Sequence, residues 1–463
     1  MKEYFKKTII LGAFLILIVS FVASCEPFVD AGPPTTQLSG ETVFEDPATV
    51  RAALANCYAL LCNSVLLTGS IDGLSIKLGY YADELEPYGG GQSEFAFFQN
   101  NLTATNSTIN TIWSNSYNLV YALNSVLEGL ENSSGISDAD KEIFTGEALL
   151  MRSMIYFNLT NLFGDIPYIT TTDYMANTVT PKVSIPEMYA RLTADLNLAQ
   201  QKLPVEYAAP SRTIPNRSVA AALLARLYLY EGNWELASQK ADEVINMTEF
   251  YALENDLDRV FVKDSQSTLW QLSPSIEGMA TREGQNFIFT MGPPPSRALN
   301  PLLVQAFESS DMRKQYWIGT VSNGSSTWYH PFKYKQRIRT DVSSEYSVVL
   351  RLEELYLIRA EARSHTGDLT GAANDLNVIR NRAGLQDTQA TTPAQLQDAV
   401  MLERRLELFC EHGHRWFDLK RSGLAGANLS QSKPGWNSTD ILWPLPQNEL
   451  LLNPALLPQN TGY

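Results

Sequence analysis

The chain has 463 residues and a formal net charge of −15, with 44% hydrophobic and 10% aromatic residues. This length is ample for a large hydrophobic core or for two sub-domains. The acidic balance argues against nucleic acid or an anionic membrane surface as a partner, because both would repel the protein. We therefore expect a function that does not involve nucleic acid.

Residues 1–24 have the layout of a secretory signal. Basic residues come first, the apolar run TIILGAFLILIVSFVAS follows, and small residues lead directly to Cys25. The run is too short and too close to the terminus for a convincing membrane span. The pattern resembles the lipobox of bacterial lipoproteins, which implies that Cys25 carries acyl chains that anchor the protein in the outer membrane. The alternative is an ordinary signal peptide followed by a chance cysteine.

The other three cysteines do not form an obvious disulfide framework. Cys57, Cys62 and Cys410 are an odd number, and each lies in an apolar stretch. This setting favours small buried core residues with unreactive thiols. A disulfide between Cys57 and Cys62 is the alternative.

Helical signals begin after a Pro- and Gly-rich segment. Residues 25–45 predict a lipidated tether and a strap that docks on the body. Asp46 is a candidate N-cap and Pro47 occupies the first helical position. Apolar residues at helical spacing predict long helices over 107–131 and 138–163.

Two later segments resemble each other. Residues 223–245 and 356–380 each predict two helices joined at a glycine, Gly232 or Gly367. A residue that accepts positive φ suits the end of the first helix, and a small residue five positions later suits a close helix crossing. The segments resemble tetratricopeptide (TPR) repeats, although about 100 residues separate them.

The segment between the two hairpins differs in character. Residues 249–345 are rich in Gly, Pro, Ser and aromatics, and they predict short extended stretches and loops without helices. The predicted fold is therefore mainly all-α: a TPR-like helical-hairpin scaffold, about 46–248 and 346–463, with a large irregular, loop-rich insertion. Loops on a rigid scaffold are a common basis for binding sites.

Four segments together resemble the SusD/RagB family of nutrient-binding outer-membrane lipoproteins. They are GEALLMRSMIYFNLTNLFGDIPYI (146–169), RLEELYLIRAEARSHTGDLTGAANDLNVIRNRAGL (351–385), LERRLELFCEHGHRWFDLKRSG (402–423) and ILWPLPQNELLLNPALLPQNTGY (441–463). The resemblance implies one SusD-like domain over 46–463, displayed on the cell exterior. It further implies capture of oligosaccharide or peptide, delivery to a SusC-like TonB-dependent transporter, no catalysis and no cofactor.

The charged residues of these segments predict ion pairs along and between helices, because many are spaced three or four positions apart. They are Glu403, Arg404, Arg405, Glu407, Arg415 and Asp418. We also interpret Asp83, Glu84 and Glu86 as the edge of a structural loop.

Chemical motifs are sparse. The sequence contains no HExxH, P-loop or GxSxG motif and no Rossmann glycine pattern. His412 and His414 are two positions apart, a spacing that directs side chains to different sides of a helix, so a zinc site there is disfavoured. Two alternatives stay open: a surface glycoside hydrolase with two carboxylates, and a TPR-type adaptor that binds protein but no nutrient.

Carbohydrate rings stack on aromatic side chains, and their hydroxyls bond to Asn, Gln, Asp and Arg. Two segments offer this mixture: residues 86–101, EPYGGGQSEFAFFQNN, and the insertion. The predicted ligand-binding residues are Tyr88, Phe97, Asn100, Arg297, Trp317, Trp328 and Tyr329.

Overall fold

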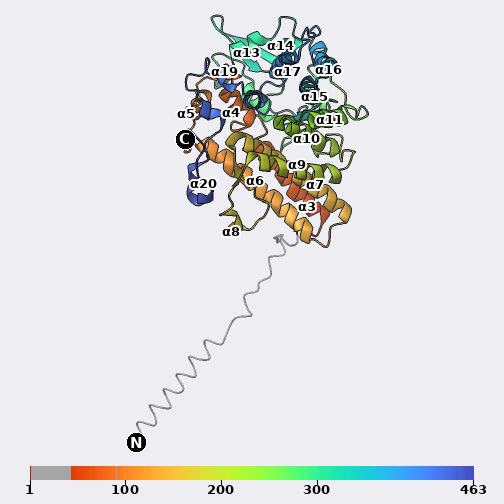
Figure 1. Ribbon diagram of the computed structural model, residues 1–463, viewed down its shortest axis with the longest axis vertical. Coiled ribbons are helices and arrows are strands. Elements are labelled where there is room, and N and C mark those ends of the chain that lie inside the picture. The colour runs from red at the N-terminus through yellow and green to blue at the C-terminus, as the bar shows by residue number, and fades with distance from the viewer. Residues whose placement is uncertain (2–42, 90) are drawn as a thin grey trace.

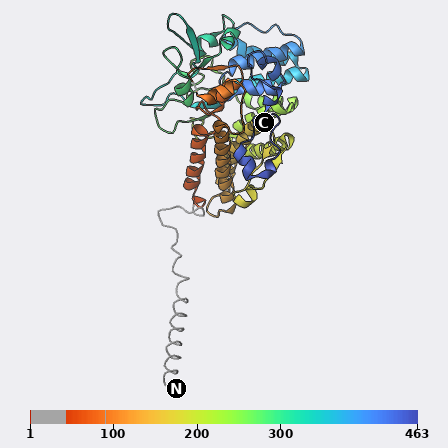
Figure 2. The same ribbon diagram turned by 90° about the vertical axis from the view of Figure 1, so that its left-hand side faces the viewer.

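Stacked helices form most of the body of the protein in the computed structural model (Figure 1, Figure 2). The structure describes residues 1, 43–89 and 91–463. The predicted signal, Cys25 and most of the predicted strap therefore lie outside the described residues. The N-terminal part of the body contains α3 (Pro47–Asn63), α4 (Leu74–Tyr81), α5 (Gln92–Phe98), α6 (Ser107–Asn132), α7 (Asp138–Phe163), α8 (Tyr174–Asn177) and α9 (Ile185–Lys202).

Local capping signals set the ends of these helices as predicted. The Asp46 carboxylate accepts a hydrogen bond from Ala48 N at 2.8 Å and caps α3. Ser137 caps α7 in the same way, and α7 ends before Gly164 at a φ of +78°. A residue without Cβ fits that left-handed conformation, so the long helix stops there.

The two predicted hairpins are confirmed. The first is α10 (Arg217–Glu231) with α11 (Trp234–Ile245), and the second is α15 (Leu352–Thr366) with α16 (Leu369–Arg382). Gly232 has a φ of +73° and Gly367 a φ of +90°, which is the helix ending that their positions predict. Ala237 and Ala372 are fully buried, as close helix crossings require.

Although distant in sequence, the two hairpins are neighbours in space. Helix α11 packs along α15. At this junction the Trp234 and His365 rings stack with centroids 3.8 Å apart and planes 3° from parallel. One continuous stack of helices therefore runs through the body, in the order α6, α7, α9, α10, α11, α15 and α16. The insertion leaves this stack between two successive hairpins.

The insertion contains short elements of both kinds. They are β4 (Thr268–Leu272), α12 (Arg282–Phe287), β5 (Arg297–Leu299), α13 (Pro301–Ala306), α14 (Met312–Trp317), β6 (Ile318–Ser322), β7 (Thr327–Pro331) and β8 (Ser347–Arg351). The prediction that this segment lacks helices is wrong. Thr281, Asn300 and Asp311 each cap a six-residue helix, and runs this short show little apolar periodicity.

The strands form two-stranded antiparallel sheets. Strand β1 (Leu85–Pro87) pairs with β5, β2 (Ile166–Pro167) with β3 (Lys182–Val183), β4 with β8, and β6 with β7. The β4–β8 pair brings the start of the insertion back to the strand that enters α15. The β1–β5 pair joins the loop after α4 to the middle of the insertion, with Pro87 opposite Arg297.

The C-terminal part packs back onto the N-terminal helices. It contains α17 (Pro393–Glu407), α18 (His414–Arg421), α19 (Ala425–Leu429), η1 (Ser438–Ile441), α20 (Gln447–Leu452) and η2 (Pro454–Leu456). Trp443 lies within 6 Å, centroid to centroid, of Tyr81, Phe97 and Phe163. Within the described residues, no helix has the length and apolar character that crossing a bilayer requires.

Candidate functional site

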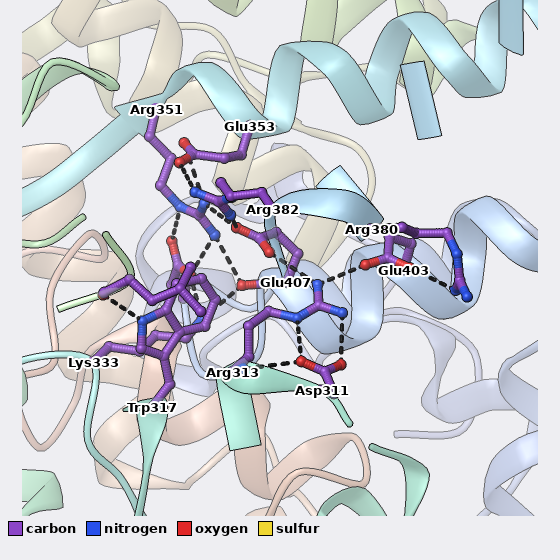
Figure 3. Close-up of polar contacts among 12 residues, drawn as sticks. Asp311, Arg313, Trp317, Lys333, Arg351, Glu353, Arg380, Arg382, Glu403 and Glu407 are labelled. Carbon is purple, nitrogen blue, oxygen red and sulfur yellow. Dashed lines mark hydrogen bonds and ion pairs between the residues drawn. The ribbon is translucent and has the colours of Figure 1, made fainter. Parts of the chain in front are cut away.

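The charged residues of the insertion and the C-terminal helices form a buried ion-pair network (Figure 3). The Glu407 carboxylate in α17 accepts from Arg351 at 2.6 Å and from Arg313 at 2.9 Å, and it also pairs with Arg382. These arginines come from β8, α14 and α16. Burial alone would raise the pKa of Glu407, but Arg382, Arg351 and Arg313 outweigh it and hold that pKa well below its usual range. The network therefore joins the insertion to the scaffold.

The predicted pairs of the other motif charges are also confirmed. Arg404 donates to Asp418 at 2.8 Å. Arg405 and Arg415 both pair with Asp83, at 3.0 and 2.8 Å, so Asp83 ties the loop after α4 to the C-terminal helices. Arg404, Arg415 and Asp418 are buried, and Arg405 and Asp83 are partly buried, so these pairs organise the architecture of the protein.

A hollow of about 260 Å³ opens beside the β1–β5 pair. Its wall is partly apolar and partly polar, which is the usual composition of a small-ligand site. The lining residues are Ile71, Glu94, Gln285, Asn286, Phe287, Ile288, Phe289, Pro295, Ser296 and Arg297. Helix α12 and the segment before β5 thus supply most of the wall.

Two predicted aromatics stand beside this hollow. Tyr88 N donates to Ser296 O at 2.7 Å, which extends the β1–β5 ladder along the wall. The Trp328 indole covers Gly292, where an added Cβ would lie 2.1 Å from the ring. Burial and the Glu86 carboxylate raise the pKa of Tyr88, and the Trp328 side chain opposes that rise.

The seven predicted ligand-binding residues fall into two groups. Tyr88, Trp328 and Tyr329 are half-buried, and Arg297 is buried but lines the hollow. Three others lie in the interior and present no surface to a ligand. Phe97 packs on Trp443, the Asn100 amide donates to Tyr81 O at 3.1 Å, and Trp317 donates to Leu257 O at 2.9 Å. An aromatic-rich sequence cannot by itself distinguish core aromatics from exposed ones.

Sequence reasoning missed the polar wall of the hollow. Gln285 and Asn286 belong to the run REGQNF, which forms α12, and Glu94 lies in α5. The available signal was Thr281, whose hydroxyl accepts from Gly284 N and caps that helix. A cap followed by several amides would have indicated a short helix with a polar face.

The three cysteines in the described part of the chain, together with His412 and His414, lie in the interior. Cys57, Cys62 and Cys410 are buried free thiols, and burial raises the pKa of Cys62 to about 12. His412 precedes α18 with a φ of +46°, so the expectation that it shares a helix with His414 is wrong, and their rings lie 6.4 Å apart. Within the described residues, no cluster of three or more His, Cys, Asp or Glu could hold a metal ion.

A second surface feature is apolar. We call it the α6–α8–α20 face. It contains a hollow of about 360 Å³ whose wall includes Trp113, Tyr117 and Tyr121 of α6. Its most exposed apolar side chains, each more than half exposed, are Tyr121, Tyr174, Met175, Val179, Leu451 and Leu452. Exposed apolar side chains gathered around a hollow are common at interaction sites.

Comparisons with known proteins agree with this architecture. A family model described as "SusD family" matches residues 308–463, and one described as "Starch-binding associating with outer membrane" matches residues 88–229. The chain is 25% identical over 510 aligned positions to "SusD-like protein P2" of Formosa agariphila, covering 97% of this chain and 99% of that protein.

Solved structures share the fold. A SusD superfamily protein from Bacteroides vulgatus superimposes with a TM-score of 0.78 at 22% identity, over 91% of this chain and all of the other. The surface glycan-binding protein A of Bacteroides fluxus superimposes with a TM-score of 0.74 at 20% identity, over 90% and 99%. The stacked hairpins and their insertion therefore form a TPR-like helical scaffold of known fold.

The two family matches cover separate parts of the same fold, and the curated relative aligns along nearly the whole chain. These findings together support a SusD-like family protein.

Proposed function

We propose that the protein is a cell-surface nutrient-binding lipoprotein. It captures oligosaccharide, or in the alternative peptide, and delivers it to a SusC-like TonB-dependent transporter in the outer membrane. The observation that carries the proposal is the hollow at β1–β5, with half-buried aromatics beside it and amides in its wall. Two comparisons support the proposal: one matching family model is described as "Starch-binding associating with outer membrane", and one structure of the same fold is named a surface glycan-binding protein.

The chemistry of the hollow suits a sugar. Tyr88 and Trp328 stand outside the wall of the hollow, since the Tyr88 hydroxyl donates to Glu86 at 3.5 Å on the face of the β1–β5 pair opposite Arg297. Their half-buried rings offer flat apolar surface on which a sugar unit extending past the edge of the pair would stack. Gln285 and Asn286 supply amide groups that both donate to and accept from hydroxyls. Contacts of this kind hold a ligand without changing its bonds.

A hydrolase would need different groups. Glycoside hydrolysis uses two carboxyl groups on opposite sides of the bond that is cut. Glu94 is the one carboxylate among the residues that line this hollow, and Lys77 lies 3.8 Å from it. The lining therefore favours capture as the function of the site.

Direct binding tests the proposal. Purified full-length protein in detergent is titrated with glucan, galactan and uronan oligosaccharides and with peptides, with calorimetry as the readout. We expect saturable binding of at least one ligand, and we expect Trp328→Ala and Tyr88→Ala to weaken it about tenfold or more, as loss of a stacking aromatic does. Tyr121→Ala is the matched control, because Tyr121 lies on the α6–α8–α20 face.

The outcomes separate the three classes. No saturable binding of any sugar or peptide would favour the adaptor and overturn the proposal. New reducing ends after incubation with polysaccharide would establish a hydrolase instead. Loss of binding in the Tyr88 and Trp328 variants, with the Tyr121 variant unchanged, would locate capture at this hollow.

A further inference from the structure

Arg297 differs from the other buried arginines of the described residues. Each of the others has a carboxylate oxygen within 4.0 Å; these are Arg152, Arg226, Arg313, Arg351, Arg359, Arg382, Arg404 and Arg415. Arg297 is 5% exposed, and no carboxylate in the described part of the chain lies within that distance. Because burying a cation without a counter-ion is costly, such a residue calls for an explanation.

The hydrogen bonds of Arg297 leave part of its guanidinium unused. Nε donates to the Tyr80 hydroxyl at 3.1 Å, and Nη1 donates to Asn286 O at 2.6 Å. A guanidinium has five N–H donors, so these two neutral contacts fix its position and leave N–H groups on Nη1 and Nη2. Arg297 lines the hollow at β1–β5, where a ligand has access to those donors.

The charges around Arg297 do not neutralise it directly. Lys77 is 1% exposed and forms ion pairs with both nearby carboxylates, Asp72 at 3.4 Å and Glu94 at 3.8 Å. The Asp72 side chain is 46% exposed, so water screens its charge. In the β1–β5 ladder Glu86 pairs with Ala298, whereas Pro87 pairs with Arg297. Successive side chains of a strand point to opposite faces, so the Glu86 side chain lies on the face opposite the Arg297 side chain. Arg297 therefore lines the hollow without a carboxylate of its own among the described residues, since Glu94, which lines the same hollow, pairs with Lys77.

We propose that this hollow recognises an acidic substituent on its sugar, either a uronic acid carboxylate or a sulfate ester, through Arg297. This inference rests on the proposed capture function and narrows its substrate class. A planar guanidinium pairs with two oxygens of such a group at once, and its bonds to a charged acceptor are about twice as strong as those between neutral groups. The acidic group of the ligand then serves as the counter-ion that Arg297 lacks among the described residues.

The test compares three named probes with full-length protein in detergent. They are oligogalacturonate for the carboxylate, sulfated galactan oligosaccharides for the sulfate, and laminarin oligosaccharides as the neutral reference. We expect one of the acidic probes to bind at least tenfold more tightly than the neutral one. Its affinity should fall severalfold when NaCl rises from about 0.05 to about 0.5 M, because salt screens an ionic contact. The probe that binds identifies the acidic group.

The matched variants assign the effect to Arg297. Arg297→Gln removes the charge and should weaken the acidic probe on the order of tenfold or more while changing any neutral binding less than threefold. Arg191→Gln removes the same charge from an exposed pair in α9 and should leave all three affinities unchanged. Arg297→Lys should bind the acidic probe more tightly than Arg297→Gln but less tightly than the parent protein. Lysine keeps the positive charge but lacks the planar guanidinium that donates two parallel hydrogen bonds.

The results that overturn the inference differ from those that overturn the proposed function. Preferential, salt-insensitive binding of laminarin oligosaccharides would refute acidic recognition and leave capture intact. Failure of every sugar and peptide to bind would refute both. The comparison of probes and the salt dependence use unaltered protein, so they decide the question even if Arg297→Gln does not fold.

Discussion

Arg351 at the end of β8 and Glu407 in α17 form a buried ion pair, with Nη1 2.6 Å from the carboxylate oxygen. Both side chains are 2% exposed or less. The pair lies where the strand that closes the insertion enters the second hairpin. Glu407 also pairs with Arg313 of α14, so one carboxylate fixes the base of the loop-rich insertion to the scaffold.

Glu407→Gln should therefore destabilise the protein strongly. The substitution keeps the shape of the side chain but leaves Arg351, Arg313 and Arg382 without their shared counter-ion. Removing one partner of a buried ion pair costs about 3–5 kcal/mol. Urea unfolding followed by circular dichroism would measure this loss.

An exposed ion pair provides the control for that experiment. Glu187 and Arg191 are spaced i,i+4 on α9, and their side chains are 50% and 41% exposed. Glu187→Gln should change the free energy of unfolding by less than about 1 kcal/mol, since surface pairs contribute little. Equal losses in the two variants would show that the network around Glu407 is not structural.

Acid should destabilise the protein because it protonates the carboxylates of buried ion pairs. Burial would raise the pKa of Asp418, but Arg404 and Arg421 outweigh it and lower that pKa to about 2. An unfolded aspartate has a pKa of about 3.9, so the stabilisation is present above that pH and is lost as pH falls towards 2. In Asp418→Asn we expect lower stability at pH 7 and a shallower loss between about pH 5 and pH 2. Parallel slopes for the two proteins would contradict this assignment.

Glu84 should have the opposite pH dependence. It is 1% exposed, and burial followed by repulsion from Asp83 raises its pKa to about 8. A carboxyl group whose pKa is raised on folding contributes stability at low pH that is lost as pH rises through the folded value. Glu84→Gln removes the ionisation and keeps an oxygen that can accept from Cys410 N, 3.1 Å away.

The variant should therefore gain stability relative to the parent protein as pH rises from about 5 to about 9. Thermal unfolding at several pH values measures this difference, and taking the difference cancels contributions from other groups. Glu131→Gln, an exposed change at the end of α6, should show no such trend. A constant difference across this range would mean that Glu84 is ionised in the folded protein at neutral pH.

Much of the helical scaffold could be predicted because its signals are local. Ser137 and Gly164 define the ends of α7, and Gly232 and Gly367 define the hairpin turns. A cap or a positive φ depends on a few neighbouring residues, which the sequence displays directly. The stacking of Trp234 on His365 depends on the path of the intervening insertion, so the repeat spacing gave no indication of it.

The site could be predicted in part. The structure brings together at the β1–β5 pair the two segments that the sequence indicated, residues 86–101 and the insertion. The sequence did not separate Trp328, which covers Gly292 beside the hollow, from Trp317, which is fully buried next to the ion-pair network. Burial is decided by long-range packing, and both residues lie in similar polar and aromatic sequence. The unpaired state of Arg297 is likewise a property of its three-dimensional surroundings.

The lipid anchor makes a direct prediction. Cys25 lies outside the described residues, and its proposed modification rests on the lipobox pattern. Cys25→Ala should abolish incorporation of labelled palmitate and release the protein from the outer-membrane fraction, because a protein without acyl chains has little affinity for a bilayer. Cys62→Ala removes a buried thiol and should leave fractionation unchanged. Unaltered sedimentation of the Cys25 variant would refute the anchor.

The α6–α8–α20 face lies beside the point where the described body begins. The Phe44 ring packs against Gly129 at the end of α6, and the neighbouring Glu128 accepts from Thr172 N, two residues before α8. If the proposed SusC-like transporter binds this chain, we expect its extracellular loops to dock on this face, since exposed apolar surface is stable when a protein partner covers it.

Negative charge introduced on the α6–α8–α20 face should therefore weaken binding of the transporter. We expect the double variant Met175→Asp, Leu452→Asp to lose most co-purification with a co-expressed transporter, because docking would bury two unpaired carboxylates. Its glycan affinity should not change, since neither residue lines the hollow at β1–β5. Ile338→Asp adds a charge at an exposed apolar residue of the insertion and serves as the control. Retained co-purification in the double variant, or an equal loss in the control, would place the transporter interface elsewhere.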